Sequence, residues 1–376
     1  MFNPNQKRLL ALDGGGILGA ISIQILKEIE TQLREVSGAG DEFRLRDFFD
    51  YFAGTSTGAI IAAGLAIGKS VDELDAFYQE RGEEMFQRAK LMKRWRHKYS
   101  NTALSALLKA EFMNSSICEL QASGALSRDK HLLVVTRNVE TDSPWPISSN
   151  PAALFNDTSL PDCNLNIPLW QLVRASTAAP TFFAPERLQW DPKDPDKQFY
   201  FEDGGVTPYN NPAFILYRMA TQPTFKCNWP SGEDKMMLVS VGTGSAARAL
   251  EDPDADGEGL ISTATTIAGE LMRGISIEND INCRTFGRCV SGAKIDAELG
   301  DMVEDHNPNN PKAFLYARYE VDSSSAGLEA LGLSDINPDD LTLDNVDAVP
   351  DLVRIGQAAA KEVDMAKQFP AFMPGG

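Results

Sequence analysis

Residues 48–67 read FFDYFAGTSTGAIIAAGLAI, and this stretch decides which fold we expect. Residues 48–53 are typical of a buried strand and residues 59–67 of a helix, with Gly54-Thr55-Ser56-Thr57-Gly58 between them. A serine in this G-x-S-x-G context lies on a sharp strand-to-helix turn, with its hydroxyl exposed at the helix N-terminus. The two glycines permit so tight a turn. An alternative interpretation is that the serine or a threonine only caps the following helix.

A similar strand and glycine turn come earlier in the chain. Residues 8–12 are typical of a buried strand, which ends at Asp13-Gly14-Gly15-Gly16. Apolar residues then recur at helical spacing, namely Ile21, Ile25, Leu26, Ile29 and Leu33. Strand, glycine turn and helix in repeated order predict a mostly parallel sheet covered by helices, which is an α/β fold.

The remaining sequence predicts further elements of one domain. The expected elements are buried strands at 131–136 and 236–241, a short strand at 199–202, an edge strand at 314–321, a small-residue helix over 174–183 stopped by Pro180, and a C-terminal helix containing Leu352, Ile355, Ala359, Val363 and Phe369. We expect one compact domain over residues 1–376, with a core at about 8–244, a helical cap at about 70–126 and a C-terminal elaboration at about 245–376.

The charge balance excludes one class of partner. The chain has 35 Lys and Arg residues against 53 Asp and Glu residues, for a net charge of −18. Duplex DNA or RNA is not an expected partner, because binding it requires positive charge that neutralises phosphates. Residues 88–98 differ from the rest, since they carry six basic residues and Trp95 without an acidic residue. This segment is either a solvated helix face or a site for anionic lipid headgroups or a phosphorylated ligand.

Cysteine usage and hydropathy predict a reduced, cytoplasmic protein. The five cysteines are widely spaced and form no C-x-x-C pair, which argues against a disulfide framework and against a zinc site. Residues 1–8 lead into a short strand rather than the apolar region of a signal peptide, and no window of 18 residues is wholly apolar. We therefore expect a soluble protein without a metal or other cofactor, whose contact with a membrane is peripheral.

Ser56 is a candidate nucleophile, and such a serine needs a proton acceptor and hydrogen-bond donors for an oxyanion. The amides of Gly14, Gly15 and Gly16 are the candidate donors. Both glycine turns follow strands whose carboxyl ends share one edge of a parallel sheet, where ligands bind in such folds. Three successive glycines also let the backbone approach a substrate atom closely.

Asp203 is the candidate proton acceptor. It follows a short strand and precedes Gly204 and Gly205, which allow close approach to another chain segment. A carboxylate is a weak base toward an alcohol, yet it suffices where the oxyanion donors supply about 3 kcal/mol or more each. Taken alone, the Asp203 turn is equally typical of a helix cap or turn former. Three histidines are expected to be surface or structural residues, because none follows a strand into a glycine turn; they are His97, His131 and His306.

Residues 14–19 also satisfy G-x-G-x-x-G after a strand, which is the pattern of a dinucleotide-binding turn. That interpretation requires an acidic residue about 20 positions further on, at the end of a second strand. The residue at that distance is Glu35, which instead ends the expected helix before a glycine-rich turn. A nicotinamide or flavin enzyme is therefore the disfavoured alternative.

Three blocks in order, Asp13-Gly14-Gly15-Gly16-Ile17-Leu18-Gly19, Gly54-Thr55-Ser56-Thr57-Gly58 and Asp203-Gly204-Gly205, resemble the patatin-like phospholipase family. The resemblance covers at least residues 8–244. It implies a three-layer α/β/α sandwich and hydrolysis of fatty-acyl esters of lipids by a Ser–Asp dyad without metal. Carried over by position, Ser56 is the nucleophile, Asp203 the proton acceptor, and the amides of Gly14, Gly15 and Gly16 the oxyanion hole. Leu18 departs from the family, which usually has Arg or Lys there, and this departure puts the headgroup preference in doubt.

Over its whole length the chain is similar to the patatin-like phospholipase effectors of bacterial cyclic-oligonucleotide antiphage defence. The similarity rests on Arg8-Leu9-Leu10-Ala11-Leu12-Asp13, on Tyr316-Ala317-Arg318-Tyr319-Glu320-Val321 and on residues 327–333. It implies activation by a cyclic dinucleotide and degradation of membrane phospholipids at the inner face of the cell membrane. The sequence shows no nucleotide pocket, and residues 88–98 and 245–310 are the candidate regions for one.

Three hypotheses follow from the sequence. The first is a serine acyl hydrolase that acts on membrane phospholipids and is activated by a cyclic dinucleotide. The second is an ungated patatin-like lipid acyl hydrolase, and the third is a nucleotide-binding protein that uses residues 14–19 without hydrolysis. The acyl position and homo-oligomer formation stay open.

Overall fold

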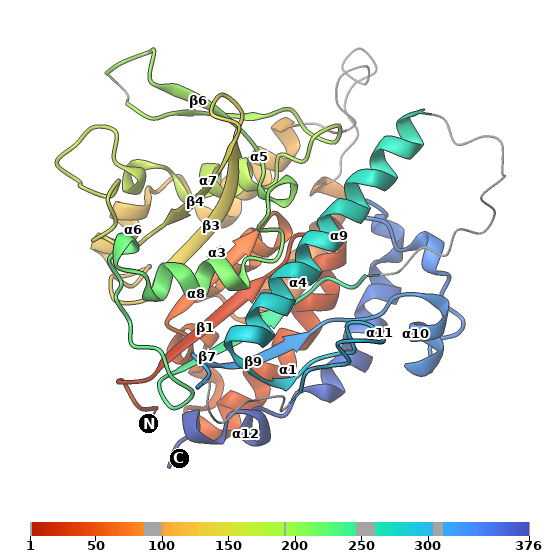
Figure 1. Ribbon diagram of the computed structural model, residues 1–376. Helices are drawn as coiled ribbons and strands as arrows, with labels where there is room; N and C mark the ends of the chain where they lie inside the picture. Colours follow the sequence, from red (N-terminus) through yellow and green to blue (C-terminus); the bar gives the residue numbers. More distant parts are fainter. Residues whose placement is uncertain are drawn as a thin grey trace.

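The computed structural model describes residues 2–85, 99, 101–191, 193–245, 260–303 and 311–375 (Figure 1). A nine-stranded sheet crosses the molecule in the order β5-β6-β3-β2-β1-β7-β9-β8, and β4 pairs with β3 beside this path. The strands are β1 (Lys7–Leu12), β2 (Tyr51–Thr55), β3 (His131–Asn138), β4 (Ser143–Ser148), β5 (Glu186–Gln189), β6 (Gln198–Asp203), β7 (Met236–Val241), β8 (Arg288–Ser291) and β9 (Leu315–Tyr319).

Six of these strands, from β3 to β8 along the sheet, run parallel, whereas β4, β5 and β6 pair antiparallel at one side. The α-helices are α1 (Gly19–Ser37), α2 (Leu45–Phe48), α3 (Thr57–Ala66), α4 (Val71–Met85), α5 (Asn101–Phe112), α6 (Ile117–Ser123), α7 (Leu169–Ser176), α8 (Ala213–Thr221), α9 (Leu260–Phe286), α10 (Ser325–Ala330), α11 (Val349–Ala359) and α12 (Met365–Gln368).

Helices cover both faces of the sheet, as Figure 1 shows, and the predicted three-layer α/β/α sandwich is confirmed. Side chains alternate along β1, so Leu10 and Leu12 join the core beneath α1 and α3, whereas Leu9 and Ala11 join the core beneath α8. All four of these side chains are fully buried. Strands buried on both faces explain why residues 8–12 lack polar alternation.

Four local predictions differ from the structure. The predicted C-terminal helix is two helices, α11 and α12, because Val363 between them is extended. The strand predicted at an edge is β9, which lies between β7 and β8 inside the sheet. The small-residue helix ends at Ser176 rather than continuing to Pro180, because Thr177 leaves the helical conformation. Residues 45–48 form the short helix α2, so β2 begins at Tyr51 rather than Phe48. Residues 88–98 lie outside the described residues, as does part of 245–310.

A helix that crosses a membrane needs about 20 consecutive, predominantly apolar residues. Among the residues that the structure describes, no helix combines sufficient length with sufficient apolar character to cross a membrane.

Candidate active site

Ser56 lies on the turn between β2 and α3, with φ 54° and ψ −122°. Such a conformation is rare for a residue other than glycine and persists only where the surroundings hold it. The flanking glycines are required by close packing: a Cβ on Gly54 would lie 2.1 Å from the carbonyl oxygen of Gly58, and one on Gly58 would lie 2.2 Å from that of Leu12. The turn therefore displays the serine because β1, β2 and α3 leave room only for backbone around it.

A buried hydroxyl at the end of α7 supports this turn. Ser176 Oγ accepts a hydrogen bond from the Ser56 amide at 2.9 Å and donates one to the Val135 carbonyl oxygen at 2.6 Å. Its side chain is fully buried. One hydroxyl thus joins the serine turn to β3, a contact that the sequence did not reveal because small residues at 174–179 predicted only close helix packing.

The structure brings Ser56 and Asp203 together, although they are 147 positions apart in the chain. Asp203 ends β6, which runs antiparallel to β3 and places this residue opposite Thr136. Ser56 Oγ donates a hydrogen bond to Asp203 Oδ2 at 2.7 Å, and Asp203 Oδ1 accepts one from the Gly205 amide at 2.7 Å. Each carboxylate oxygen therefore has a partner, and one of the two faces the serine hydroxyl.

The carboxylate of Asp203 is 4% exposed, and this burial raises its pKa to about 6. The hydrogen bonds from Ser56 and Gly205 and the nearby positive charge of Arg174 oppose the rise. Arg174 is itself fully buried and contacts the ring of Phe183 through its guanidinium at 5.1 Å. Among the described residues, no hydrogen-bond partner contacts its Nε and Nη1 atoms and no carboxylate forms an ion pair with it, whereas Nη2 donates to the Ala184 carbonyl oxygen at 3.2 Å. Arg174 was not predicted to act at the site, although an arginine among small apolar residues is a detectable signal.

The glycine turn after β1 lies beside the serine, since a Cβ on Gly14 would lie 3.2 Å from the Cβ of Ser56. The Gly14 amide donates to the Asn210 carbonyl oxygen at 3.2 Å. Among the described residues, no hydrogen-bond acceptor contacts the amides of Gly15 and Gly16. Two of the three predicted donors are thus unoccupied, whereas the third is used within the fold.

Packing around the remaining glycines also restricts side chains. A Cβ on Gly19 would lie 2.6 Å from Thr57 Oγ1, and one on Gly204 would lie 2.3 Å from the Val135 carbonyl oxygen. A Cβ on Gly205 would lie 3.0 Å from Asp203 Oδ1. All the glycines singled out in the sequence therefore surround one site.

His131 lies away from this site. It begins β3, at the amino-terminal end of the parallel strands, whereas Ser56 follows the carboxyl-terminal end of β2. Its ring stacks on that of Trp229, with ring centroids 5.5 Å apart. Burial lowers its pKa to about 4, which favours the neutral imidazole. This placement agrees with a structural role, whereas His97 and His306 lie outside the described residues.

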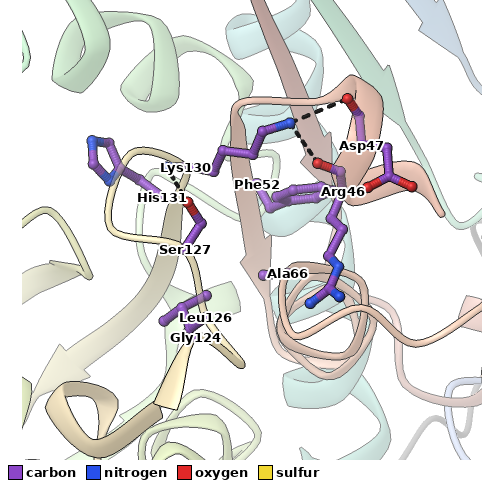
Figure 2. Close-up of a pocket in the computed structure, with 9 residues that line it drawn as sticks. All are labelled: Arg46, Asp47, Phe52, Ala66, Gly124, Leu126, Ser127, Lys130 and His131. Atoms are coloured by element: carbon purple, nitrogen blue, oxygen red, sulfur yellow. Dashed lines mark hydrogen bonds between the residues drawn. The ribbon is translucent and has the colours of Figure 1, made fainter. Parts of the chain in front are cut away.

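A cavity of about 300 Å³ lies near His131, between α2, the end of α3 and the start of β3 (Figure 2). Figure 2 shows Lys130 and Arg46 among the residues that line it. The Lys130 ammonium donates to the carbonyl oxygens of Arg46, Asp47 and Phe49, and the Arg46 guanidinium donates to those of Ile67 and Ala125. These cations stabilise the ends of backbone segments, and the cavity is separate from the serine and aspartate.

The dinucleotide alternative finds no support at the glycine turn. Glu35 lies within α1 rather than at the end of a strand, so the acidic residue that this interpretation requires is in the wrong element.

Comparison with known proteins covers the part of the chain that holds this site. Residues 10–217 match the model of a family described as patatin-like phospholipase. The chain is 32% identical over 218 residues to a cGAMP-activated phospholipase of Vibrio cholerae serotype O1. The matched region covers 56% of this chain and 57% of that protein. This chain is also 27% identical over 253 residues to Patatin-T5 of Solanum tuberosum, and that match covers 64% of this chain and 61% of Patatin-T5. The chain therefore matches less than two thirds of the length of these relatives.

The fold is shared with a solved structure. Human GIVD cytosolic phospholipase A2 superposes with a TM-score of 0.50 at 13% identity, which covers 98% of this chain and 60% of that one. At this identity the likeness concerns the arrangement of the sheet and helices.

Proposed function

Because the chain belongs to the patatin-like phospholipase family, we propose that it hydrolyses fatty-acyl esters of membrane phospholipids through a dyad of Ser56 and Asp203. The observation that carries this proposal is the 2.7 Å hydrogen bond from Ser56 Oγ to Asp203 Oδ2 on a strained strand-to-helix turn. A serine hydroxyl aimed at a buried carboxylate beside unoccupied backbone amides is suited to acyl transfer.

The first half of the reaction forms an acyl-enzyme. Ser56 Oγ attacks the ester carbonyl carbon while its proton passes to Asp203 Oδ2, and the carbonyl oxygen becomes an oxyanion. The amides of Gly15 and Gly16 are the donors that we assign to this oxyanion, whereas Gly14 fixes the turn through its bond to Asn210. The bond from carbon to the leaving alcohol oxygen then breaks, and Asp203 returns the proton to that oxygen.

The second half reverses these roles with water. Asp203 accepts a proton from a water molecule, the hydroxide oxygen attacks the acyl carbon, and the same amides stabilise the second oxyanion. Collapse of this intermediate breaks the bond to Ser56 Oγ, which regains its proton from Asp203 and releases the fatty acid. The pKa of about 6 suits Asp203 to both accept and donate a proton near neutral pH.

Two substitutions test the dyad. Ser56→Ala and Asp203→Ala should each abolish fatty-acid release from phosphatidylcholine vesicles, and Ser56→Ala should abolish labelling by a fluorophosphonate probe. Asp157→Ala, which removes an exposed aspartate from the loop between β4 and α7, should leave both measurements unchanged. Substantial hydrolysis by folded Ser56→Ala would overturn the mechanism.

The proposal includes activation by a cyclic dinucleotide and a role in antiphage defence at the cytoplasmic face of the membrane. It is supported by the Vibrio cholerae relative, which is named as a cGAMP-activated phospholipase, and by the sequence similarity to antiphage effectors. Vesicle hydrolysis should be low in the protein alone and rise at least 10-fold with one member of a cyclic dinucleotide panel that includes cGAMP. Full activity without ligand would instead favour the alternative of an ungated acyl hydrolase, to which the similarity to Patatin-T5 also points.

A further inference from the structure

A buried ion pair lies directly beneath the glycine turn. Arg318, in β9, donates from Nη1 to Asp13 Oδ1 at 2.9 Å and from Nη2 to Asp13 Oδ2 at 2.6 Å. The two side chains are only 2% and 4% exposed. Arg318 Nη1 also donates to Ser240 Oγ at 2.7 Å, and Nη2 contacts Glu320. The guanidinium therefore joins β9 and β7 to the last residue before Gly14.

Asp13 is one of several anchors on the same short segment. Thr243 Oγ1 donates to the Gly14 carbonyl oxygen at 3.1 Å, beside the bond from the Gly14 amide to Asn210. On the far side of the turn, the Ile17 amide donates to the Leu343 carbonyl oxygen at 2.9 Å. Gly15 and Gly16 therefore lie between residues that hydrogen bonds hold in place on both sides. Their own amides have no hydrogen-bond acceptor among the described residues.

Stability alone does not account for such a pair. Removing two charges from water costs several kcal/mol per ion, and apolar replacements of a buried pair are often neutral or stabilising by about 1–4 kcal/mol. Burial raises the pKa of Asp13, while the adjacent Arg318 opposes that rise and favours the ionised carboxylate. A bidentate guanidinium instead fixes the direction in which a carboxylate, and the backbone that carries it, can lie.

We propose that Arg318 is a positioning residue, which holds Asp13 so that the amides of Gly15 and Gly16 face the oxyanion formed at Ser56. The proposal rests on the acyl-transfer function proposed above. It assigns a role to a strand that lies beyond residues 10–217, the part of the chain that matches the family model. Because oxyanion donors act only over short distances, a small shift of the turn should lower turnover without weakening substrate binding.

The test compares Arg318→Lys and Asp13→Asn with wild type on a soluble p-nitrophenyl ester, with active sites titrated by a fluorophosphonate. We expect kcat per titrated site to fall about 10- to 100-fold with KM changed less than about 3-fold. The inhibition constant of a trifluoromethyl ketone, which forms a tetrahedral adduct with the serine, should rise by the same factor as kcat falls. Arg8→Lys changes another buried arginine, at the opposite end of β1, and should leave these constants within about 2-fold of wild type.

A measurement that does not depend on activity separates this proposal from the proposed function. Amide hydrogen exchange in a peptide spanning residues 13–18 should accelerate at least 10-fold in Arg318→Lys, while β2 and β3 remain protected. Unchanged exchange there overturns the proposal even if wild type proves to hydrolyse no ester. Unchanged kcat per titrated site in both variants also overturns it, even where their melting temperatures fall, because the pair would then be structural only.

A double variant keeps the proposal testable if the single variants fail to fold. Asp13→Asn combined with Arg318→Gln keeps a polar contact between the side chains without burying charge. If this double variant folds and retains wild-type kcat per titrated site, the ion pair does not position the turn. If it folds with reduced kcat and a raised inhibition constant for the ketone, the proposal is supported.

Discussion

Asp203 is a buried carboxylate that must be ionised to accept the serine proton. Because its pKa is raised to about 6, kcat/KM on a soluble ester should fall as the pH decreases through about 6. Arg174 opposes the rise in the pKa, so Arg174→Met should move this midpoint to higher pH. Arg187→Met removes an exposed arginine whose guanidinium contacts Gln198 rather than the site, and it should leave the midpoint in place. A midpoint near 4 in wild type would contradict the assignment of Asp203 as the base.

The same burial makes Asp203 costly for stability at neutral pH. Its folded pKa lies above the ordinary value of 3.8, so its favourable contribution is complete below about pH 4 and is lost as the pH rises through about 6. The difference corresponds to about 3 kcal/mol. Asp203→Asn should therefore raise the melting temperature by a few degrees at pH 7 and by much less at pH 4, as measured by calorimetry. Equal effects at both pH values would show that the carboxylate charge is not the cause.

At the residue level, the sequence indicated which side chains meet but not what holds them. Ser56, Asp203 and the glycines were predictable because each sits in a short glycine-bounded turn with few alternative conformations. Ser176, Arg174 and Arg318 were not, because their contacts join segments that only the folded sheet brings together.

At the scale of elements, α7 supports the strained serine turn through a single hydroxyl. Ser176→Ala would leave the Ser56 amide and the Val135 carbonyl without their shared partner, and each unpaired buried group costs about 1–3 kcal/mol. We expect a lower melting temperature together with reduced kcat, because the turn can then relax from its positive φ.

A matched serine separates the two effects. Ser149 is also buried, and its Oγ accepts the Leu132 amide at 2.8 Å near the start of β3, far from the site. Ser149→Ala should lower the melting temperature to a similar degree while kcat is retained. If Ser176→Ala also retained kcat, the hydroxyl would serve the fold and not the turn.

The helix α9 shows where element prediction from sequence was incomplete. The sequence of residues 245–310 indicates loops and helices but not their bounds, and in the structure α9 spans 27 of these residues and reaches the site. Asn279 Nδ2 donates to the Pro208 carbonyl oxygen at 2.7 Å, and Asn210 Nδ2 donates to Ser276 Oγ at 3.2 Å. The sequence does not reveal these contacts, because they join residues 71 and 66 positions apart in the chain.

Over the whole molecule, sequence order and spatial order diverge most at the centre of the sheet. β1 pairs with β2 on one side and with β7, more than 220 positions later, on the other. β9 then pairs with β7 on one side and with β8 on the other, although β8 precedes β9 in the chain. Repeated strand, turn and helix units predicted the parallel α/β class, but strand order depends on these distant pairings, which no local pattern encodes.

Net charge is a property of the whole chain that should govern its approach to lipid surfaces. At −18, the protein should be repelled by anionic membranes at long range. Screening acts over about 30 Å at 0.01 M salt and about 8 Å at 0.15 M. We therefore expect hydrolysis of vesicles rich in phosphatidylglycerol to be slower than that of phosphatidylcholine vesicles at 0.01 M salt, and this difference should shrink at 0.15 M.

Hydrolysis of a soluble, uncharged ester is the control for this comparison, because salt should change it little if the effect acts on membrane approach and not on the chemistry at Ser56. Faster hydrolysis of anionic vesicles at low salt would contradict the prediction. It would show that a local cationic segment outweighs the net charge, and residues 88–98, with six basic residues, would be the first to neutralise. Substituting those basic residues by glutamine should then remove the salt dependence while the rate on the soluble ester is kept, since a contact of that kind acts on membrane approach alone.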